Sequence, residues 1–269
     1  MVNNTSDRFR YASILLKELV RTDFKLRYQG SVLGYAWSLL KPLFMFAILY
    51  TVFTVVFKIG KDIPNFPIYL LLGIVLWNFF TEMTQQSLGA IVGRGDLIRK
   101  IRIPRWLIIV SSSVGALINL GLNLLVVLVF VFISGMDLLA TSILLPLFVL
   151  EIYIFALGLS LLLSALFVKY RDISYIWDVF LQAGFYATPI LYPISLITNV
   201  TAQKILLLNP MAQAIQGARN VFVTPETSTI NDVWQSQWAF LIPLLIVFAT
   251  LLIGVLYFKK EAKDFAENL

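Results

Sequence analysis

Cysteine and histidine are both absent from this chain of 269 residues, and only 13% of the residues are charged. Without cysteine the chain forms no disulfide bond and offers no thiolate nucleophile. Without histidine it lacks the imidazole base and a principal zinc ligand of proteins. The phosphate-binding pattern GxxxxGK[ST] is also missing, which excludes nucleotide binding through a P-loop. We therefore expect no metal site and no cofactor in the chain itself.

Long apolar runs are what the chain has instead, and hydrophobic residues make up 59% of it. No charged residue occurs from Trp106 to Met136, and the run from 138 to 168 contains only Glu151. A helix needs about 20 apolar residues to cross the hydrocarbon core of a bilayer, so each run is long enough to span it. The pattern indicates an all-α integral membrane protein with a single transmembrane domain over residues 1–269.

Six transmembrane helices are predicted from these runs. Their ranges are 32–57, 67–91, 106–133, 139–166, 173–188 and 238–258. The fifth range is short and is followed by Pro189 and Pro193. Because proline interrupts helical hydrogen bonding, this unit is expected to break or re-enter the membrane rather than cross it cleanly.

Basic residues are concentrated on one side of these spans. That side carries Arg8, Arg10, Lys17, Arg21, Lys25, Arg27, Arg94, Arg99, Lys100, Arg102, Arg105, Lys169, Arg171, Lys259, Lys260 and Lys263. The opposite side carries Lys58, Lys61, Lys204 and Arg219. Because cytoplasmic loops are enriched in lysine and arginine, both termini are predicted to lie in the cytoplasm. The net charge of +6 is then mainly a topology signal, and we expect no nucleic-acid partner.

Two segments outside the spans have helical patterns of their own. Residues 8–28 carry an apolar face and a basic face at 100° per residue, which predicts an amphipathic helix on the cytoplasmic membrane surface. The extracytoplasmic segment 188–237 contains Asn209, which can cap a helix, followed by Pro210 at the first helical position. Short re-entrant or interfacial helices are therefore expected between the fifth and sixth spans.

Three acids, Glu82, Glu151 and Asp178, fall within the apolar runs. Placing an acid inside a bilayer costs about 2.5–3.5 kcal/mol on insertion scales, so such residues are candidates for function. Each can take part in gating or in a proton path. Each can also make a structural hydrogen bond or lie in the interface, and the sequence leaves both interpretations open.

Aromatic residues make up 14% of the chain, and several cluster near the predicted span ends. They can form the aromatic belt of a membrane protein. Alternatively, they can form a flat, uncharged track along which a sugar chain slides. The candidates for such a track are Tyr35, Trp37, Trp77, Phe80, Trp177 and Tyr186.

Four segments carry a distinctive pattern: LRYQGSVLGYAWSLLKPL (26–43), LWNFFTEMTQQSLGAIVGRGDLIRKIRIPRW (76–106), KYRDISYIWDVFLQAGFYATPILYP (169–193) and LNPMAQAIQGARNVF (208–222). In this order and spacing they resemble the permease subunits of bacterial type-2 ATP-binding-cassette exporters, in the branch that exports O-antigen, capsule and teichoic-acid polysaccharides. The resemblance implies a homodimeric pathway in the bacterial plasma membrane. It also implies two copies of a separate ATPase subunit, which binds ATP and magnesium.

The resemblance further implies two sets of site residues. A coupling helix at 93–105 and a second cytoplasmic connection are expected to contact the ATPase through Leu97, Ile98, Arg99, Lys100, Arg102, Pro104, Arg171 and Asp172. The family's substrate is a glycan on a polyprenyl-diphosphate carrier in the membrane, and arginine binds phosphate oxygens bidentately. The entrance for this diphosphate is assigned to Arg21, Lys25, Arg27 and Lys41.

Two other functions compete with a polysaccharide exporter. The first is a related ATP-driven exporter of drugs or small lipids. The second is a membrane enzyme acting on polyprenyl-linked sugars, which would need clustered aspartate or histidine for acid–base or metal chemistry. The sequence contains no DxD, HxxH or paired-carboxylate cluster, so a transporter subunit without catalytic residues is the expected function.

Overall fold

The computed structural model describes residues 5–28, 30, 33–58, 63–100, 104–263 and 265, and all regular structure within them is helical. The α-helices are α1 (Thr5–Tyr28), α2 (Trp37–Thr51), α3 (Phe66–Ala90), α4 (Gly95–Lys100), α5 (Trp106–Ser134), α6 (Leu145–Lys169), α7 (Ile173–Ala187), α8 (Val200–Leu207), α9 (Pro210–Phe222), α10 (Ile230–Trp234) and α11 (Leu241–Glu261). The shorter helices are η1 (Gly34–Ala36), η2 (Val52–Val56), η3 (Val92–Arg94), η4 (Ala140–Leu144) and η5 (Ile194–Leu196). The expected all-α fold is confirmed.

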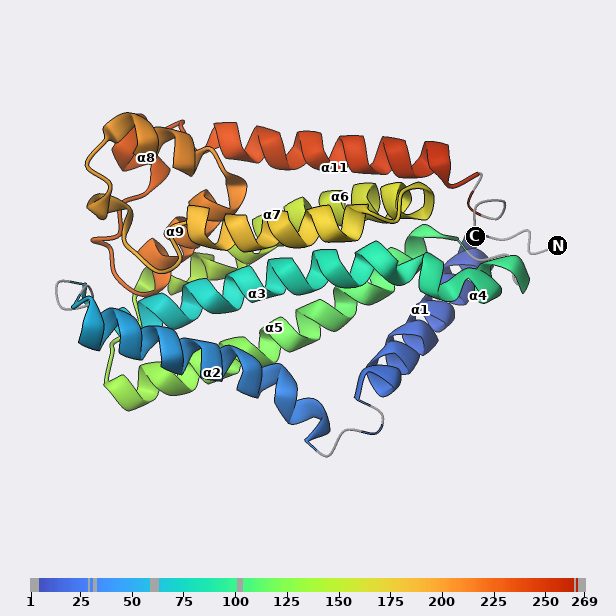
Figure 1. The fold of residues 1–269 in the computed structure, drawn as a ribbon, viewed down its shortest axis with the longest axis horizontal. Helices are drawn as coiled ribbons and strands as arrows, with labels where there is room; N and C mark the ends of the chain where they lie inside the picture. The colour runs from blue at the N-terminus through green and yellow to red at the C-terminus, as the bar shows by residue number, and fades with distance from the viewer. Residues whose placement is uncertain are drawn as a thin grey trace.

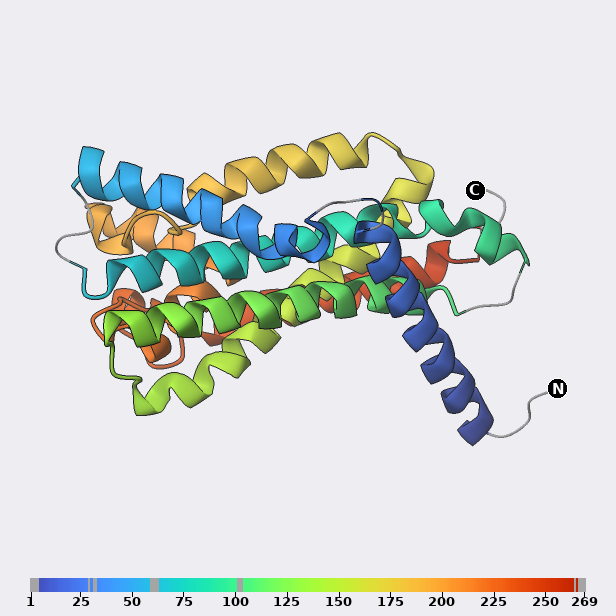
Figure 2. The ribbon, with the colours of Figure 1, turned by 90° about the horizontal axis from the view of Figure 1, so that it is seen from below.

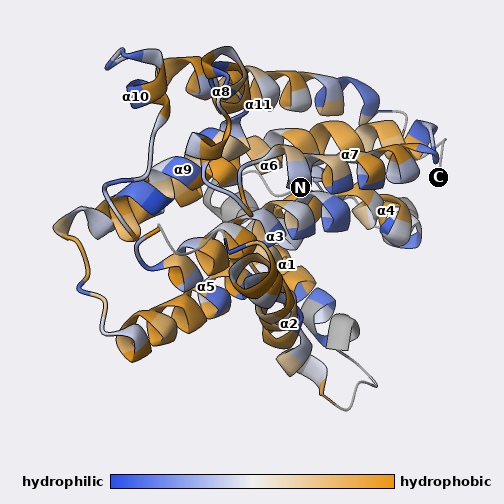
Figure 3. Cartoon of the chain, turned by 60° about the vertical axis from the view of Figure 1, so that its left-hand side comes forward, coloured by the Kyte–Doolittle hydropathy of each residue, from blue (hydrophilic) through white to orange (hydrophobic). Residues whose placement is uncertain are grey.

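Five helical segments are long and apolar enough to cross a membrane: Trp37–Val56, Phe66–Ala90, Trp106–Ser134, Ala140–Lys169 and Leu241–Glu261. They run lengthwise through the molecule (Figure 1) and correspond to the predicted spans one to four and six. Hydrophobic residues cover most of their length (Figure 3), as lipid contact requires. A multi-pass membrane protein is therefore confirmed.

The predicted fifth span is the helix α7, which contains 15 residues and ends before Thr188. At 1.5 Å per residue its length is about 22 Å, less than the roughly 30 Å thickness of a bilayer core. After α7 the chain passes through Pro189 and Pro193 into the short helix η5. The unit is thus as short as the sequence indicated, and the count of six spans stays a prediction.

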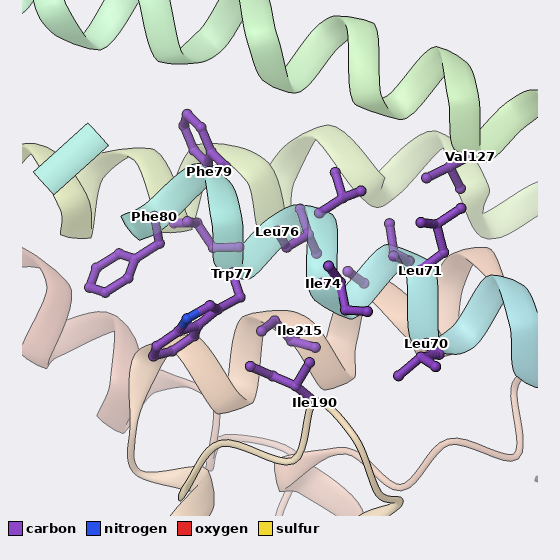
Figure 4. Packing of buried hydrophobic residues seen from close by; sticks show 14 of the residues in the cluster. Leu70, Leu71, Ile74, Leu76, Trp77, Phe79, Phe80, Val127, Ile190 and Ile215 are labelled. Carbon is purple, nitrogen blue, oxygen red and sulfur yellow. The ribbon is translucent and has the colours of Figure 1, made fainter. Parts of the chain in front are cut away.

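The helix α3 forms the centre of the bundle, and 78% of the residues in its most apolar 18-residue stretch are buried. It contacts α2, α5, α6, α7 and α9. Its buried side chains include Leu70, Ile74 and Leu76, and Figure 4 shows Ile190 and Ile215 facing this helix from other segments. In the segment Trp37–Val56, which contains α2, only 11% of the corresponding stretch is buried, so α2 lies at the periphery of the described chain.

The segment predicted to lie on the outer side folds into α8, α9 and α10 at one end of the bundle (Figure 1). Asn209 caps α9 as expected, because its side chain accepts a hydrogen bond from the backbone N–H of Met211, with Pro210 at the first position. Almost every residue of α9 is buried, and the helix packs against α3 and α6. How deeply α9 enters a membrane stays a prediction.

The amphipathic segment forms α1, which projects obliquely from the bundle (Figure 2) and packs against α5. Leu19 is buried, whereas Arg10, Lys17, Arg21 and Lys25 are exposed. The helix predicted over residues 8–28 is therefore present, and its position on the membrane surface stays a prediction.

Candidate functional site

Polar residues form a stripe along one face of α3, in the half that precedes the cytoplasmic segment predicted from sequence. The stripe consists of Asn78, Thr81, Glu82, Gln85 and Gln86, which occupy positions i, i+3, i+4, i+7 and i+8 and therefore share one helix face. This polar stripe lines a cavity of about 310 Å³. Facing residues come from α2 and α5 and include Trp37, Ser38, Lys41 and Asn119. We refer to this space as the α3 cavity.

Glu82 lies in a cradle of amide groups in the α3 cavity. Its carboxylate Oε1 accepts a hydrogen bond of 2.7 Å from Gln86 Nε2 and another from Asn119 Nδ2. Asn119 is buried, and its Oδ1 atom has no partner among the described residues. An unpaired buried acceptor costs free energy unless a donor reaches it. Of the residues in the polar stripe, the sequence analysis selected only Glu82. The helical spacing of the other polar residues of the stripe was the signal that could have identified them.

Two side chains of α7 connect to the polar stripe region of α3. Gln85 Nε2 donates to Asp178 Oδ1 at 2.8 Å, and Trp177 Nε1 donates to Thr84 Oγ1 at 3.1 Å. Asp178, one of the three acids in the apolar runs, thus takes part in an interhelical hydrogen bond. The arrangement couples the position of α7 to the wall of the α3 cavity.

The aromatic candidates occupy different environments. Trp77 and Phe80 are buried, and they contact each other at a ring-centroid distance of 5.6 Å. Phe80 also stacks on Phe155 at 5.7 Å. Trp77 and Phe80 therefore contribute to the hydrophobic core (Figure 4). Trp37 and Tyr186 are exposed, and Trp37 lines the α3 cavity. The side chain of Tyr35 lies outside the described residues.

Among the entrance residues whose side chains are described, Arg21 and Lys41 line different cavities. Arg21 lines an apolar cavity of about 540 Å³ between α1 and α5, together with Lys17, which the sequence did not select. Lys25 is exposed further along α1, and Lys41 lies in the α3 cavity. The side chain of Arg27 lies outside the described residues. The structure thus places Arg21 beside an apolar cavity and Lys41 beside the cavity that the polar stripe of α3 lines.

The predicted coupling segment begins as η3 and α4. Ile98 is half-buried and packs on an apolar cluster that includes Ile91 and Ile108, and Pro104 is exposed. Arg171 and Asp172 are exposed in the connection between α6 and α7. Arg102 and the side chains of Leu97, Arg99 and Lys100 lie outside the described residues.

An ion pair links the coupling segment to α1. Arg94 of η3 donates to the carboxylate of Asp23, and it also donates to Ser111 Oγ of α5 at 3.3 Å. Ser111 Oγ donates its own proton to the carbonyl oxygen of Ile108 at 2.8 Å, and it lies 3.4 Å from Asp23 Oδ2. Sequence reasoning missed this contact because its members come from three separate segments. It connects the interfacial helix, the coupling segment and a long helix in one network.

Comparison with known proteins adds an independent observation. The family described as ABC-2 type transporter matches residues 14–223. The chain is 33% identical over 223 residues to an O-antigen export system permease protein of Myxococcus xanthus. The aligned region covers 82% of this chain and 85% of that protein. It is 30% identical over 260 residues to an O-antigen export system permease protein of Klebsiella pneumoniae, with 96% of each chain covered.

Proposed function

Since the chain belongs to the ABC-2 type transporter family, we propose that it is the transmembrane subunit of an ATP-driven exporter of O-antigen-type polysaccharide. The observation that carries this proposal is the α3 cavity, where polar side chains of α2, α3 and α5 meet on otherwise apolar helices. Similarity over nearly the whole length of permeases named for O-antigen export supports the same substrate class.

The chemistry of the α3 cavity suits a sugar chain. Sugar hydroxyl groups both donate and accept hydrogen bonds, and the cavity offers amide, hydroxyl and carboxylate groups that can do the same. Trp37 adds a half-exposed ring. In our proposal, Glu82 and Asn119 contact sugar hydroxyls as the glycan enters the bundle.

The diphosphate of the carrier would be held at the base of the first span. Arg21, Lys25, Arg27 and Lys41 are the proposed contacts, because a diphosphate must be neutralised before it approaches a low-dielectric path. The apolar cavity beside Arg21 offers space for part of the carrier's hydrocarbon chain.

ATP hydrolysis is assigned in this proposal to a separate ATP-binding subunit, which holds magnesium and docks on the coupling segment. The exposed connection at Arg171 and Asp172 supplies a second contact. Two copies of each chain form the exporter in the bacterial plasma membrane. In this proposal the chain crosses the membrane six times with both termini in the cytoplasm, so these contacts lie on the cytoplasmic side.

The proposed function is tested by co-purifying the chain with its ATP-binding partner in lipid nanodiscs and measuring ATP turnover. Addition of polyprenyl-diphosphate-linked O-antigen should stimulate turnover. Glu82→Gln should raise the glycolipid concentration for half-stimulation about tenfold, because a charge-assisted hydrogen bond is lost. Glu261→Gln, at the C-terminal end of α11, is the matched control. Stimulation by a small sugar-free amphiphile, and not by the glycolipid, would contradict the proposal.

The entrance is tested separately with Arg27→Gln and Lys41→Gln. Each variant should lose glycolipid stimulation while it still inserts into the membrane and binds the ATPase. Unchanged stimulation in both would leave these residues as contacts for anionic lipid only, each worth about 1 kcal/mol.

A substitution at the coupling segment tests this contact. Leu97→Asp should abolish ATPase binding, since a charged side chain cannot enter an apolar groove on the partner. Ile98 is left unchanged because it packs against Ile91 and Ile108. Normal ATPase binding and export in this variant would assign coupling to another segment.

A further inference from the structure

A further cavity lies between α6, α9 and α11, at the end of the bundle that carries α8 and α10 (Figure 1). Its volume is about 590 Å³, within the roughly 300–1,000 Å³ of small-molecule sites. Its walls are mainly apolar and include Phe148, Ile154, Phe240, Leu244 and Phe248. We refer to it as the α6–α9–α11 cavity, and the proposed export function does not use it.

Glu151, another of the acids in the apolar runs, lines this cavity. It is only 8% exposed, and its Oε1 atom has no hydrogen-bond partner among the described residues. Gln213 lines the same cavity, is 6% exposed, and its Oε1 atom is likewise unpaired within the described chain. Both residues therefore line one mainly apolar space, and each carries a buried acceptor atom without a donor among the described residues. Such groups are costly unless something supplies the missing hydrogen bonds.

The charge of the cavity restricts what that donor can be. Glu151 is the single ionisable acid or base among its lining residues, which include no lysine and no arginine. The nearby cation on α9, Arg219, donates instead to the backbone carbonyl groups of Tyr69, Pro189 and Ile190. A positively charged donor from outside the chain would complement the carboxylate.

The position of the cavity indicates a ligand from the membrane. Leu147 and Phe248, which line it, are 61% and 55% exposed on two helices long and apolar enough to span a bilayer. Side chains of a helix lean toward its N-terminus, so Glu151 leans toward the start of α6, where α10 lies against the same cavity. The space thus combines a lipid-facing apolar wall with a carboxylate that leans toward one end of a span.

We propose that the α6–α9–α11 cavity binds a phospholipid with a primary ammonium headgroup. The ammonium group donates N–H hydrogen bonds to Glu151 and Gln213. Part of the hydrocarbon chain lies against Phe148 and Phe248, and the remainder stays in the surrounding bilayer. A quaternary ammonium group carries the same charge but no N–H donor, so it cannot satisfy these acceptors.

The experiment measures lipid binding to the purified chain by native mass spectrometry. The probes are phosphatidylethanolamine, its N-monomethyl and N,N-dimethyl derivatives, and phosphatidylcholine, all with the same acyl chains. Occupancy should fall with each N–H donor removed, to about tenfold lower for phosphatidylcholine. This series uses the unchanged protein, so its outcome does not depend on the folding of a variant.

Glu151→Leu, which removes the acceptor oxygens, should reduce the preference for phosphatidylethanolamine, and Asp137→Asn, an exposed acid on the connection between α5 and α6, should keep it. Equal occupancy by all four lipids would overturn the proposal and leave water as the donor to Glu151. A preference that is undiminished in Glu151→Leu would also overturn it. Neither measurement requires the ATPase or a glycan, so failure here is distinguishable from failure of the proposed export function.

Discussion

At the scale of single residues, Arg219 shows how one buried cation can organise the end of a bundle. It is fully buried and donates to the backbone carbonyl oxygen atoms of Tyr69 at 3.0 Å and of Pro189 and Ile190 at 2.6 Å. Its guanidinium group lies 3.7 Å from the centre of the Tyr69 ring. Gly73 makes room for it, because a Cβ atom there would lie 2.3 Å from Arg219 Nη2. The side chain therefore joins α9, the start of α3 and the segment after α7.

We expect Arg219→Gln to destabilise the protein, since three backbone carbonyl groups would lose a charged donor. The apparent midpoint of thermal unfolding in detergent should fall by on the order of 5 °C or more. Arg219→Lys should recover only part of the loss, because an ammonium group lacks the planar fork that reaches separate acceptors. Arg10→Gln, on exposed α1, is the control. An unchanged midpoint in Arg219→Gln would contradict this role.

At the scale of elements, the contact between α1 and the coupling segment depends on the Asp23–Arg94 pair. Arg94 is 17% exposed and Asp23 is 32% exposed, so solvent screens the pair only in part. Since Arg94 contacts both Asp23 of α1 and Ser111 of α5, displacement of η3 is transmitted to two helices. This connection gives the coupling segment a physical route to the interfacial helix.

Reversing the charge of either partner should release α1 from the bundle. We expect Asp23→Arg and Arg94→Asp each to increase the rate of proteolysis within α1 by roughly fivefold. The double variant should restore part of the protection, because the opposite charges meet again. Glu18→Lys, exposed on the same helix, serves as the comparison. Additive effects in the double variant would argue against a direct interaction.

The crossing of α6 and α11 is another property of whole elements. A Cβ atom on Gly254 would lie 2.2 Å from the carbonyl oxygen of Gly158, and one on Gly158 would lie 2.7 Å from the backbone of Leu251. Backbones can approach this closely only where side chains are absent, as in other membrane helix pairs. The two glycines therefore set the distance between the two spans.

Gly254→Val should force these helices apart at a cost of about 1–3 kcal/mol. Thermal unfolding in detergent is measured through the loss of the monodisperse peak in size-exclusion chromatography. Gly121→Val on α5 is matched to it, because a Cβ atom there meets nothing within 4 Å. Equal effects of the two substitutions would show that helix propensity, rather than the crossing, is responsible.

At the scale of the whole molecule, the natural absence of cysteine allows the topology to be measured directly. Single cysteines at Asp137 and Glu226 should react with a membrane-impermeant thiol reagent added outside intact cells. Cysteines at Asp96 and Lys263 should react only after the membrane is opened, because the basic side is predicted to be cytoplasmic. All four positions are exposed, so burial does not limit the reaction. Labelling of both Asp137Cys and Glu226Cys from the cytoplasm would contradict the orientation.

Local patterns in the sequence were enough to determine the long helices and the capped helix α9. The run predicted at 106–133 is observed as Trp106–Ser134, and Asn209 and Pro210 begin α9 as expected. These features depend on neighbouring residues alone, since hydrophobic length and a cap are satisfied within one segment. The π-helical turn Val52–Val56, which continues α2, has no such local signal and was not predicted.

Only the tertiary structure decided which polar groups meet. Glu82 and Asn119 are 37 positions apart, Asp23 and Arg94 are 71 apart, and Arg219 and Tyr69 are 150 apart. The sequence identified Glu82 and Glu151 as costly to bury, but it could not distinguish the amide cradle around the first from the unpaired acceptors around the second. Partners of this kind are fixed by how the helices pack and cross, which depends on side-chain fit along their whole length rather than on local spacing.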